Sequence, residues 1–461
     1  MKRELEQFKR LFRYGFILLL LLGQSFAFLY CWLERYNEII VLPFVEKGHW
    51  LMAAYYLLLQ SIFLYNFDGL KFGYLKRGNM VLSQILAIIC TNVLMYLQIV
   101  LMSAKFVTFW PIVLLSVFDA VFSLIVTELS ELVFDKLFPA KGLLIIYDEY
   151  DPKVLIEKLN SRKDKYKVEK VANISMGLEA IKDMIDSVDG VVLFDIHSEV
   201  RNKILKICFD KNIRTYSTSK VSDILTRGAE DIHLFDTPLL LYRNQGLTFE
   251  QRFVKRALDI VVSFIMLIIF SPFMLVSALA IKLYDGGPVF FRQERSTINN
   301  KVFRIHKFRS MIVDAEKDGI SRPATDGDPR ITPVGKILRA TRLDELPQLI
   351  DILKGDMSLV GPRPERVEHT EMYTKEVPEF QYRLKVKGGL TGFAQLYGKY
   401  NTTPYDKLQL DLMYIQNYSF LLDLRLIFMT VKIMFVKEST EGFTDEKSKS
   451  ITEQNNNNNQ E

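Results

Sequence analysis

Four apolar runs dominate the first third of the chain, at about Tyr14 to Leu33, His49 to Phe67, Met80 to Met102 and Phe106 to Leu129. Each has about the 20 residues that a helix needs to cross the hydrocarbon core of a bilayer. The first run is too long for the apolar core of a signal peptide and has no small-residue cleavage site, so we interpret it as a retained anchor. The pattern predicts a membrane protein that begins with four transmembrane helices, in residues 1 to 138.

Basic residues set the orientation of these helices. Five precede the first run and three lie between the second and third, namely Lys2, Arg3, Lys9, Arg10, Arg13, Lys71, Lys76 and Arg77. The opposite loops hold fewer, so both ends of the bundle are expected on the cytoplasmic side. Asp119 lies inside the fourth run, and an acid at membrane depth is a candidate functional residue. We favour a role in helix-to-helix packing, because four helices are too few for most transporters.

The pattern changes in residues 139 to 246, where short apolar segments alternate with charged helical ones. The expected strands are Leu143 to Tyr147, Val191 to Asp195 and Ile213 to Ser217, with helices at Lys153 to Asn160, Leu178 to Ser187 and Glu199 to Lys211. This alternation predicts a small Rossmann-like α/β domain with a parallel sheet. Asp148 to Asp151 follow the first strand without a glycine turn, which disfavours a dinucleotide site. A regulatory or oligomerising role is the better hypothesis.

A fifth apolar segment, residues 259 to 283, carries Ser271 and Pro272 at its centre. Basic residues flank it on both sides, so both ends are expected in the cytoplasm. A central proline removes a helix hydrogen bond and can bend the segment, and a serine can satisfy the freed backbone. We therefore predict a re-entrant membrane helix hairpin that enters one leaflet and returns.

Two alternating segments, Val289 to Arg295 and Lys301 to Arg309, predict a two-stranded hairpin rich in cations. Arg304 fits a solvated strand face. Lys307 and Arg309 are better candidates for binding an anion. His306 is a lone strand histidine, which is more often structural.

The segment Arg339 to Glu365 holds an adjacent acid pair, Asp344 and Glu345. Pro347 follows closely, and proline is tolerated in the first turn of a helix, so the carboxylates are expected where a helix begins. N-capping is the plain alternative. Capping does not require the flanking basic residues or a restricted Pro-Arg-Pro that fixes the guanidinium; these residues are Arg339, Arg342, Pro362, Arg363 and Pro364.

These motifs resemble a known family. LDELPQL, KGDMSLVGPRP, GGPVFFRQER, KFRSM and GLTGFAQLYG occur in the order found in bacterial polyprenyl-phosphate hexose-1-phosphate transferases, over residues 247 to 437. Gly388-Gly389 stands where that family more often has Pro-Gly, and Ser296 to Asn300 is an atypical turn. The resemblance implies an α/β catalytic domain on the cytoplasmic face of the bacterial inner membrane.

The resemblance also implies the chemistry. Asp344 would be the nucleophile that forms a phospho-aspartyl intermediate, and Glu345, with Asp344, would bind Mg²⁺. Lys307, Arg309, Arg339, Arg342 and Arg363 would neutralise substrate phosphates, with Pro362, Pro364 and Asp411 in support. The implied reaction transfers hexose-1-phosphate from a UDP-sugar, UDP-glucose or UDP-galactose, to undecaprenyl phosphate and releases UMP. Such a step initiates the synthesis of exopolysaccharide, capsule or O-antigen.

The remaining features narrow the alternatives. The net charge of +5 fits a membrane surface, no nucleic-acid motif is present, and three distant cysteines indicate neither disulfides nor zinc. Asp326-Gly-Asp328 is better interpreted as a turn than as a metal motif. Helices within Pro404 to Val436 should lie in the membrane interface or form part of a core. Residues 438 to 461 have the composition of a disordered tail.

Two other functional hypotheses remain at this stage. One is a catalytically inert scaffold or regulator of polysaccharide assembly, and the other is a lipid-phosphate hydrolase or phosphotransferase. The intact acid pair and Pro-Arg-Pro disfavour the scaffold. Membrane helices and the middle domain are compatible with a homodimer.

Overall fold

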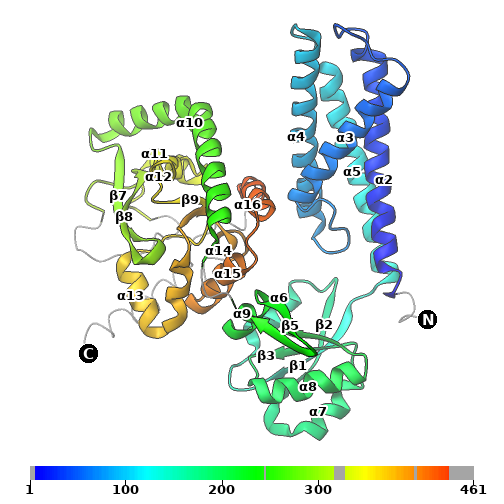
Figure 1. Ribbon diagram of the computed structural model, residues 1–461, viewed down its shortest axis with the longest axis vertical. Helices are drawn as coiled ribbons and strands as arrows, with labels where there is room; N and C mark the ends of the chain where they lie inside the picture. The colour runs from blue at the N-terminus through cyan, green and yellow to red at the C-terminus, as the bar shows by residue number, and fades with distance from the viewer. Residues whose placement is uncertain (1–5, 243–245, 316–327, 399–401, 436–461) are drawn as a thin grey trace. The chain divides into compact units, whose positions relative to one another are not determined.

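Four helices open the chain in the computed structural model, which describes residues 6–242, 246–315, 328–398 and 402–435. They are α2 (Lys9–Cys31), continued by the π-helical turn η1 (Trp32–Tyr36), α3 (Lys47–Asn66), α4 (Arg77–Ser103) and α5 (Trp110–Leu137) (Figure 1). Helix α2 contacts α3 and α5, and α4 contacts the same two helices, so the four close into a bundle. The four predicted helices are present.

The four helices of the bundle differ in hydrophobicity. Within the described residues, four helices are long and apolar enough to cross a membrane: α2 with η1, α4, α5 and the later α10 (Phe249–Asp285). Helix α3 has a similar length, but tyrosine, glutamine and asparagine interrupt its apolar sequence. It packs between α2 and α4.

The predicted packing role of Asp119 is confirmed. Its carboxylate is fully buried and accepts hydrogen bonds from the Tyr56 hydroxyl at 2.9 Å and the Asn92 amide at 3.5 Å. These bonds join α5 to α3 and α4. One turn away, the Gln24 amide donates to Ser123 Oγ at 3.0 Å and joins α2 to α5. In an apolar surrounding such bonds favour one arrangement of the helices.

A four-stranded parallel sheet follows, with the order β2-β1-β3-β4. Its strands are β1 (Lys141–Tyr147), β2 (Tyr166–Asn173), β3 (Gly190–Phe194) and β4 (Arg214–Ser217), connected by α6 (Lys153–Asn160), the short 3₁₀ turn η2 (Ile174–Met176) with α7 (Leu178–Ile185), and α8 (Ser198–Asp210). The three predicted strands and three predicted helices are present within two residues.

The pattern did not reveal β2. This strand pairs on one side only, at the edge of the sheet, and most of its residues are partly or fully exposed. Its sequence, YKVEKVAN, therefore lacks the continuous apolar run of a central parallel strand such as β1.

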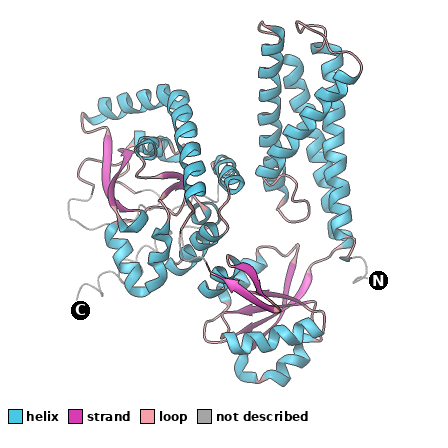
Figure 2. Ribbon diagram, viewed as in Figure 1, coloured by secondary structure: helices cyan, strands magenta, loops and turns pink. Residues whose placement is uncertain are grey.

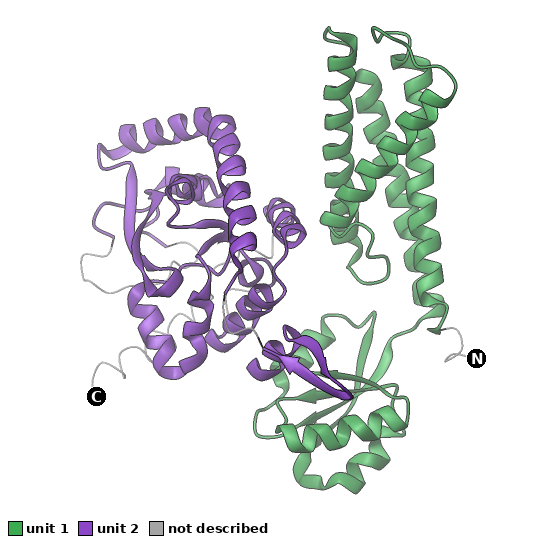
Figure 3. Cartoon of the chain, viewed as in Figure 1, with its two compact units in different colours: residues 1–220 green, residues 221–461 purple. Residues whose placement is uncertain are grey.

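The chain divides into two compact units, residues Met1–Lys220 and Val221–Glu461 (Figure 3). The second unit begins with α9 (Val221–Arg227) and an antiparallel hairpin of β5 (Glu230–Leu234) and β6 (Thr237–Leu241). Helix α9 contacts α15 (Pro404–Gln416), so it belongs with the second unit, although the sequence pattern groups this segment with the α/β domain.

The segment predicted as a re-entrant hairpin, residues 259 to 283, lies within one continuous helix, and its re-entry into a membrane stays a prediction. Helix α10 has 37 residues and includes Pro272, and Figure 1 shows that it bends sharply part way along. Proline lacks the N–H that would bond the carbonyl of Ile268, which removes one rung of the helix. The Ser271 hydroxyl donates to that carbonyl at 2.8 Å, as expected for a serine beside a proline. The Ser271 hydroxyl thus replaces the backbone N–H that Pro272 lacks, and the chain stays helical through the bend.

The rest of the second unit is mainly helical, with short strands (Figure 2). The predicted hairpin of β7 (Phe290–Ser296) and β8 (Val302–Phe308) is confirmed, and η3 (Ile298–Asn300) forms its turn. The remaining elements are α11 (Pro333–Ala340), η4 (Leu343–Glu345), α12 (Gln348–Lys354), β9 (Ser358–Val360), α13 (Val367–Glu376), η5 (Pro378–Lys385), β10 (Gly389–Thr391), α14 (Phe393–Tyr397), α15 and α16 (Phe420–Ile433).

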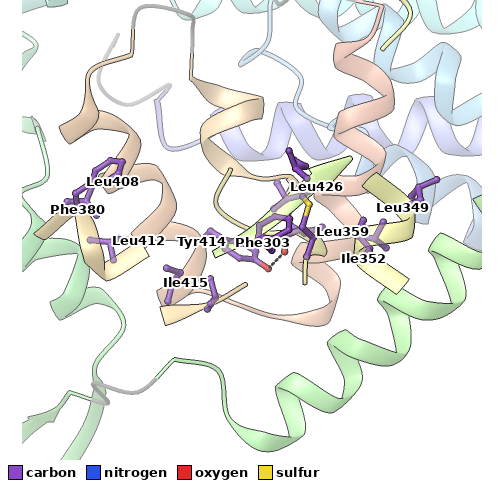
Figure 4. Close-up of a cluster of buried hydrophobic side chains, with 14 of the residues drawn as sticks. Phe303, Leu349, Ile352, Leu359, Phe380, Leu408, Leu412, Tyr414, Ile415 and Leu426 are labelled. Carbon is purple, nitrogen blue, oxygen red and sulfur yellow. Dashed lines mark hydrogen bonds between the residues drawn. The ribbon is translucent and has the colours of Figure 1, made fainter. Parts of the chain in front are cut away.

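One hydrophobic core holds these elements together (Figure 4). It joins Phe303 of β8, Leu349 of α12, Leu359 of β9, Leu412 of α15 and Leu426 of α16, all buried. The contributing elements carry or flank the predicted site residues, so the core fixes their relative positions.

Helix α16 buries charged residues as well as apolar ones. Asp423 and Lys432 are almost fully buried, together with Leu426 and Met429. This face packs within the second unit, as the core-helix alternative expects. The opposite side exposes Leu421 and Val431, and its contact with a membrane interface stays a prediction.

Candidate active site

The acid pair lies on η4, a single 3₁₀ turn between α11 and α12. Arg342 precedes it with a φ of 55°, a left-handed backbone conformation that is unfavourable for a residue with a side chain. Pro347 then supplies the N-cap of α12. The carboxylates are therefore placed where a helix begins, as Pro347 predicted.

Three cations surround Glu345. Lys307 Nζ donates to its Oε1 at 2.9 Å and Arg363 Nη2 donates to the same oxygen at 3.2 Å, while Arg342 Nη1 lies 4.0 Å from Oε2. Burial alone would raise the pKa of Glu345, but Lys307 and Arg363 outweigh it and hold that pKa well below its ordinary value. Glu345 is thus a fixed anion that orients two cations.

Asp344 has a different environment. Within the described part of the chain, its carboxylate makes no hydrogen bond and no ion pair. Burial and the neighbouring Glu345 raise its pKa to about 6, although the charges of Lys307 and Arg339 act in the opposite direction. At neutral pH this carboxylate is ionised and uncommitted, which is what a nucleophile requires.

The loop that carries Arg363 is held through its carbonyl groups. Pro362 O accepts from Gly389 N at 2.8 Å, Arg363 O from Arg383 Nη2 at 2.8 Å, and Pro364 O from Arg295 Nη1 at 3.3 Å. The prolines have no N–H to donate, so the carbonyls are the backbone groups through which they can be fixed. These three bonds position Arg363, which contacts Glu345.

Glycines allow the next strand to approach this loop closely. Strand β10 pairs with β9 in parallel, and a Cβ on Gly389 would lie 2.1 Å from the backbone nitrogen of Gly361. No side chain fits there. The second glycine of the atypical Gly388-Gly389 pair is therefore required by this packing.

A buried ion cluster supports the loop from behind. Arg383 pairs with Asp411 at 2.8 Å, and Lys407 pairs with Glu365 at 3.3 Å; the Arg383, Asp411 and Glu365 side chains are nearly inaccessible. Burial would raise the pKa of Glu365, but Lys407 and Arg383 lower it to about 2. Asp411 thus supports the site through Arg383, which in turn binds the carbonyl of Arg363.

Sequence reasoning missed Arg295, Arg383 and Glu365. Arg295 and Arg383 reach the Pro-Arg-Pro loop from distant parts of the chain, whereas Glu365 directly follows Pro364. No spacing pattern marks the three residues. Their neighbours in the sequence are themselves polar or charged, so charge did not distinguish them.

Arg309 does not join the acid pair in this structure. Its guanidinium is nearly buried and binds both carboxylate oxygens of Asp285, with Nη1 at 2.8 Å from Oδ2. It therefore holds the end of α10. Arg339 is close enough to Asp344 to lower its pKa, but no ion pair joins them. The roles of both arginines toward a phosphate stay predictions.

The plainer interpretations of three other residues agree with the structure. His306 binds Asp351 through its ring at 2.6 Å and its backbone N–H at 2.8 Å, a structural role. Arg304 is exposed and pairs with Glu294 across the hairpin. Asp328 accepts from the backbone and side chain of Arg330, as a turn residue does, and Asp326 lies outside the described residues.

The carboxylates of the acid pair can be compared with the ligands that Mg²⁺ prefers. In the described ranges no group of three or more histidine, cysteine, aspartate or glutamate side chains is placed to hold a metal. Two carboxylates are present. Among the described residues Asp344 has no ion-pair partner, and the ion pair of Glu345 Oε2 is with Arg342 at 4.0 Å. Mg²⁺ commonly takes one or two carboxylates and completes its shell with substrate oxygens and water, so these residues fit it.

Comparisons with known proteins agree with these motifs. A family model described as Bacterial sugar transferase matches residues 250–437. The chain is 39% identical over 233 residues to a UDP-N-acetylgalactosamine-undecaprenyl-phosphate N-acetylgalactosaminephosphotransferase of Aeromonas hydrophila, covering 50% of this chain and 54% of that protein. It is 42% identical over 217 residues to a UDP-glucose:undecaprenyl-phosphate glucose-1-phosphate transferase of Escherichia coli, covering 46% and 45%.

The chain thus spans about half the length of these two relatives. It matches a third relative almost completely. The Exopolysaccharide production protein PSS of Rhizobium leguminosarum is 41% identical over 198 residues, which are 41% of this chain and 96% of that protein.

Proposed function

This chain belongs to the bacterial sugar transferase family, and from that premise we propose that it transfers a hexose-1-phosphate from a UDP-sugar to undecaprenyl phosphate and releases UMP. The observation that supports the proposal is the difference between the environments of the two carboxylates, Asp344 and Glu345. Asp344 has no ion-pair partner in the described part of the chain and is ionised at neutral pH, and Glu345 holds Lys307 and Arg363 beside it. That arrangement provides a nucleophile next to two cations able to bind phosphate.

In the first step, a carboxylate oxygen of Asp344 attacks the phosphorus that carries the sugar. The bond from that phosphorus to the bridging oxygen of the diphosphate breaks, and UMP leaves with the bond electrons. The sugar phosphate remains as an acyl phosphate on Asp344. No proton has to be removed from the nucleophile, because Asp344 is already ionised above about pH 6.

In the second step, a phosphate oxygen of undecaprenyl phosphate attacks the same phosphorus. The acyl-phosphate bond breaks, Asp344 regains its carboxylate, and the product is a polyprenyl diphosphate sugar. Lys307 and Arg363 face the phosphoryl group in both steps and neutralise its charge. Glu345 keeps both cations in place between the steps.

A bound Mg²⁺, held by Asp344 and Glu345 together with substrate oxygens, would supply further charge neutralisation for the diphosphate. The positions of Lys307 and Arg363 leave Glu345 Oε2 available for that contact.

The membrane supplies the acceptor lipid. The apolar middle of α10 has basic residues at both ends, which favours re-entry from the cytoplasmic leaflet over a full crossing. The second unit would then lie on the cytoplasmic face of the inner membrane. The acid pair would be within reach of a lipid phosphate and of a soluble UDP-sugar.

The test is UMP release by the full chain in detergent, with undecaprenyl phosphate and Mg²⁺. UDP-glucose, UDP-galactose and UDP-N-acetylgalactosamine are compared, because the relatives include enzymes named for different sugars. Lipid-dependent release from one donor that vanishes in Asp344→Asn supports both the reaction and the intermediate. Release that survives Asp344→Asn would refute the covalent step alone.

Absence of release from every donor, with folded protein and lipid present, would refute the transferase and favour a scaffold in polysaccharide assembly. An exposed Glu294→Gln variant serves as the control, since Glu294 pairs with Arg304 on the outer face of the hairpin.

A further inference from the structure

Two residues on one face of α10 bind both halves of the candidate active site. They are Arg256 and Asp259, three positions apart and therefore neighbours on the helix surface. Neither lies in the motifs that marked the site. We propose that Arg256 and Asp259 are positioning residues that fix the acid pair relative to Arg363, an inference that rests on the proposed function.

Asp259 binds the strand that leads into the Pro-Arg-Pro loop. Its Oδ1 accepts from the backbone N–H of Leu359 at 2.8 Å and from the Ser358 hydroxyl at 3.0 Å. Asp259 and Ser358 are buried, so these bonds have no competition from water. The carboxylate therefore sets the position of β9, three residues before Pro362.

Arg256 binds the other half of the site. Its Nη1 and Nη2 donate to the carbonyls of Ile352 and Leu353 at 2.6 and 2.7 Å. These carbonyls belong to the last turn of α12, and that of Ile352 also accepts the backbone N–H of the C-cap residue Gly355 at 3.0 Å. The opposite end of this seven-residue helix begins three residues after Glu345. A short helix transmits a displacement of one end to the other.

A third contact fixes the turn of α10 that carries both residues. Lys255 Nζ donates to Asp423 at 2.7 Å and to the Tyr414 hydroxyl at 3.0 Å, and all three side chains are buried. The Tyr414 hydroxyl also lies 3.3 Å from the carbonyl of Val360. These hydrogen bonds join the turn of α10 around Lys255 to α15, α16 and β9.

One turn of α10 is bound both to α12, which follows η4, and to β9, which precedes Arg363. This turn therefore determines the distance between the acid pair and Arg363. The same helix continues past Pro272 into its exposed apolar segment. Loss of either bond should shift one half of the site against the other, and displacements of about 1 Å can cost two orders of magnitude in rate.

The test uses the full chain in lipid nanodiscs and compares Asp259→Leu, Asp259→Asn and Arg256→Met with Arg252→Met as the matched control. Arg252 lies one turn earlier on α10, is exposed, and makes no side-chain hydrogen bond or ion pair with η4, α12 or β9 among the described residues. Two quantities are measured: kcat and KM for UMP release, and hydrogen exchange of the segments 343–347 and 358–364.

We expect Asp259→Leu and Arg256→Met to lower kcat about 10- to 100-fold, with the KM for the UDP-sugar changed less than about 3-fold. Exchange should accelerate in 358–364 for Asp259→Leu and in 343–347 for Arg256→Met. Asp259→Asn should restore most of kcat, because an amide oxygen accepts the same two bonds. Arg252→Met should match the unsubstituted protein in both measurements.

Unchanged kcat in both Asp259→Leu and Arg256→Met, or exchange no faster than in Arg252→Met, would overturn the positioning role. If Asp259→Leu does not fold, Arg256→Met decides the question. If the unsubstituted protein releases no UMP, the proposed function fails, while the exchange measurements still decide whether Arg256 and Asp259 fix the two segments.

Discussion

At the scale of single residues, two adjacent carboxylates of similar chemistry acquire opposite properties. Glu345 accepts from Lys307 and Arg363, so its pKa is lowered. Asp344, one position earlier on the same turn, has no such partner in the described structure, and burial raises its pKa. Groups whose pKa values are separated in this way can take different roles in one reaction. In the proposed reaction the paired residue organises the site and the other is the nucleophile.

The pH dependence of the rate should report the ionisation of Asp344. A nucleophilic carboxylate must be ionised, so kcat/KM for UMP release should rise with pH, pass its midpoint near the Asp344 pKa of about 6, and level off above it. Initial rates of UMP release between about pH 5 and 8 measure this rise in kcat/KM. Glu294→Gln should keep the same profile. A rate that stays constant between about pH 5 and 7 would contradict the assignment.

Replacing Asp344, the proposed nucleophile, should stabilise the protein at neutral pH. Folding raises the pKa of Asp344 from its ordinary 3.8 to about 6, so its charge destabilises the folded state above about pH 6 and stops doing so as the pH falls toward 4. We expect Asp344→Asn to raise the free energy of unfolding at pH 7.5 by about 1–3 kcal/mol. Thermal unfolding at several pH values measures this gain, which should vanish near pH 4. A gain that is independent of pH would contradict the explanation.

At the scale of elements, α10 carries two separate functions along its length. Its first turns bind α12 and β9, and its last residue, Asp285, binds the Arg309 guanidinium. Between them, Pro272 bends the helix and Ser271 satisfies the carbonyl that proline leaves unpaired. The bend decides whether the two ends can lie on the same side of a membrane.

Pro272→Ala should straighten α10. Alanine restores an N–H that can bond the carbonyl of Ile268, so the break in the helical ladder disappears. A cysteine at Tyr284 in a cysteine-free chain, labelled with a membrane-impermeant maleimide, measures the effect. We expect labelling only in inside-out vesicles for the parent and additional labelling from the periplasmic side for Pro272→Ala.

Ser271→Ala is the matched control for that experiment, because it keeps the proline and removes only the hydroxyl bond. It should retain the parent labelling. Periplasmic labelling of the parent itself would mean that α10 crosses the membrane, as its length and composition permit.

At the scale of the whole molecule, each compact unit has hydrophobic cores of its own. One core lies inside the helical bundle and others surround the parallel sheet, while the second unit has a separate core made by β8, α12, β9, α15 and α16. The contacts that build the site, including the support of Asp411 and Arg383, all belong to the second unit. A unit with its own core can fold independently.

The second unit alone, residues 221–461, should therefore fold and release UMP with kcat within about 10-fold of the full chain. Cooperative thermal unfolding reports the fold, and Asp344→Asn in the same fragment reports the background rate. A folded but inactive fragment would show that the bundle or the parallel sheet contributes to catalysis.

The sequence by itself determined the elements and the chemistry that depend on local pattern. Apolar runs revealed the helices of the bundle, and continuous apolar segments revealed β1 and β3. The short segment Ile213 to Ser217 revealed β4, and the alternation of Val289 to Arg309 revealed the β7–β8 hairpin. Pro347 placed the acid pair at the start of a helix. These features follow from side chains within a few residues of one another, so periodicity and propensity are sufficient to predict them.

Only the tertiary structure decided which of the many cations serve the acid pair. Lys307 and Arg363, 38 and 18 positions from Glu345, converge on one of its oxygens, whereas Arg309, two positions after Lys307, binds Asp285 instead. Arg383 and Asp259 act on the Pro-Arg-Pro loop from distant elements. The pairing of β2 at the sheet edge was likewise settled by packing. Contacts between residues far apart in the chain depend on the arrangement of the core, which no local pattern encodes.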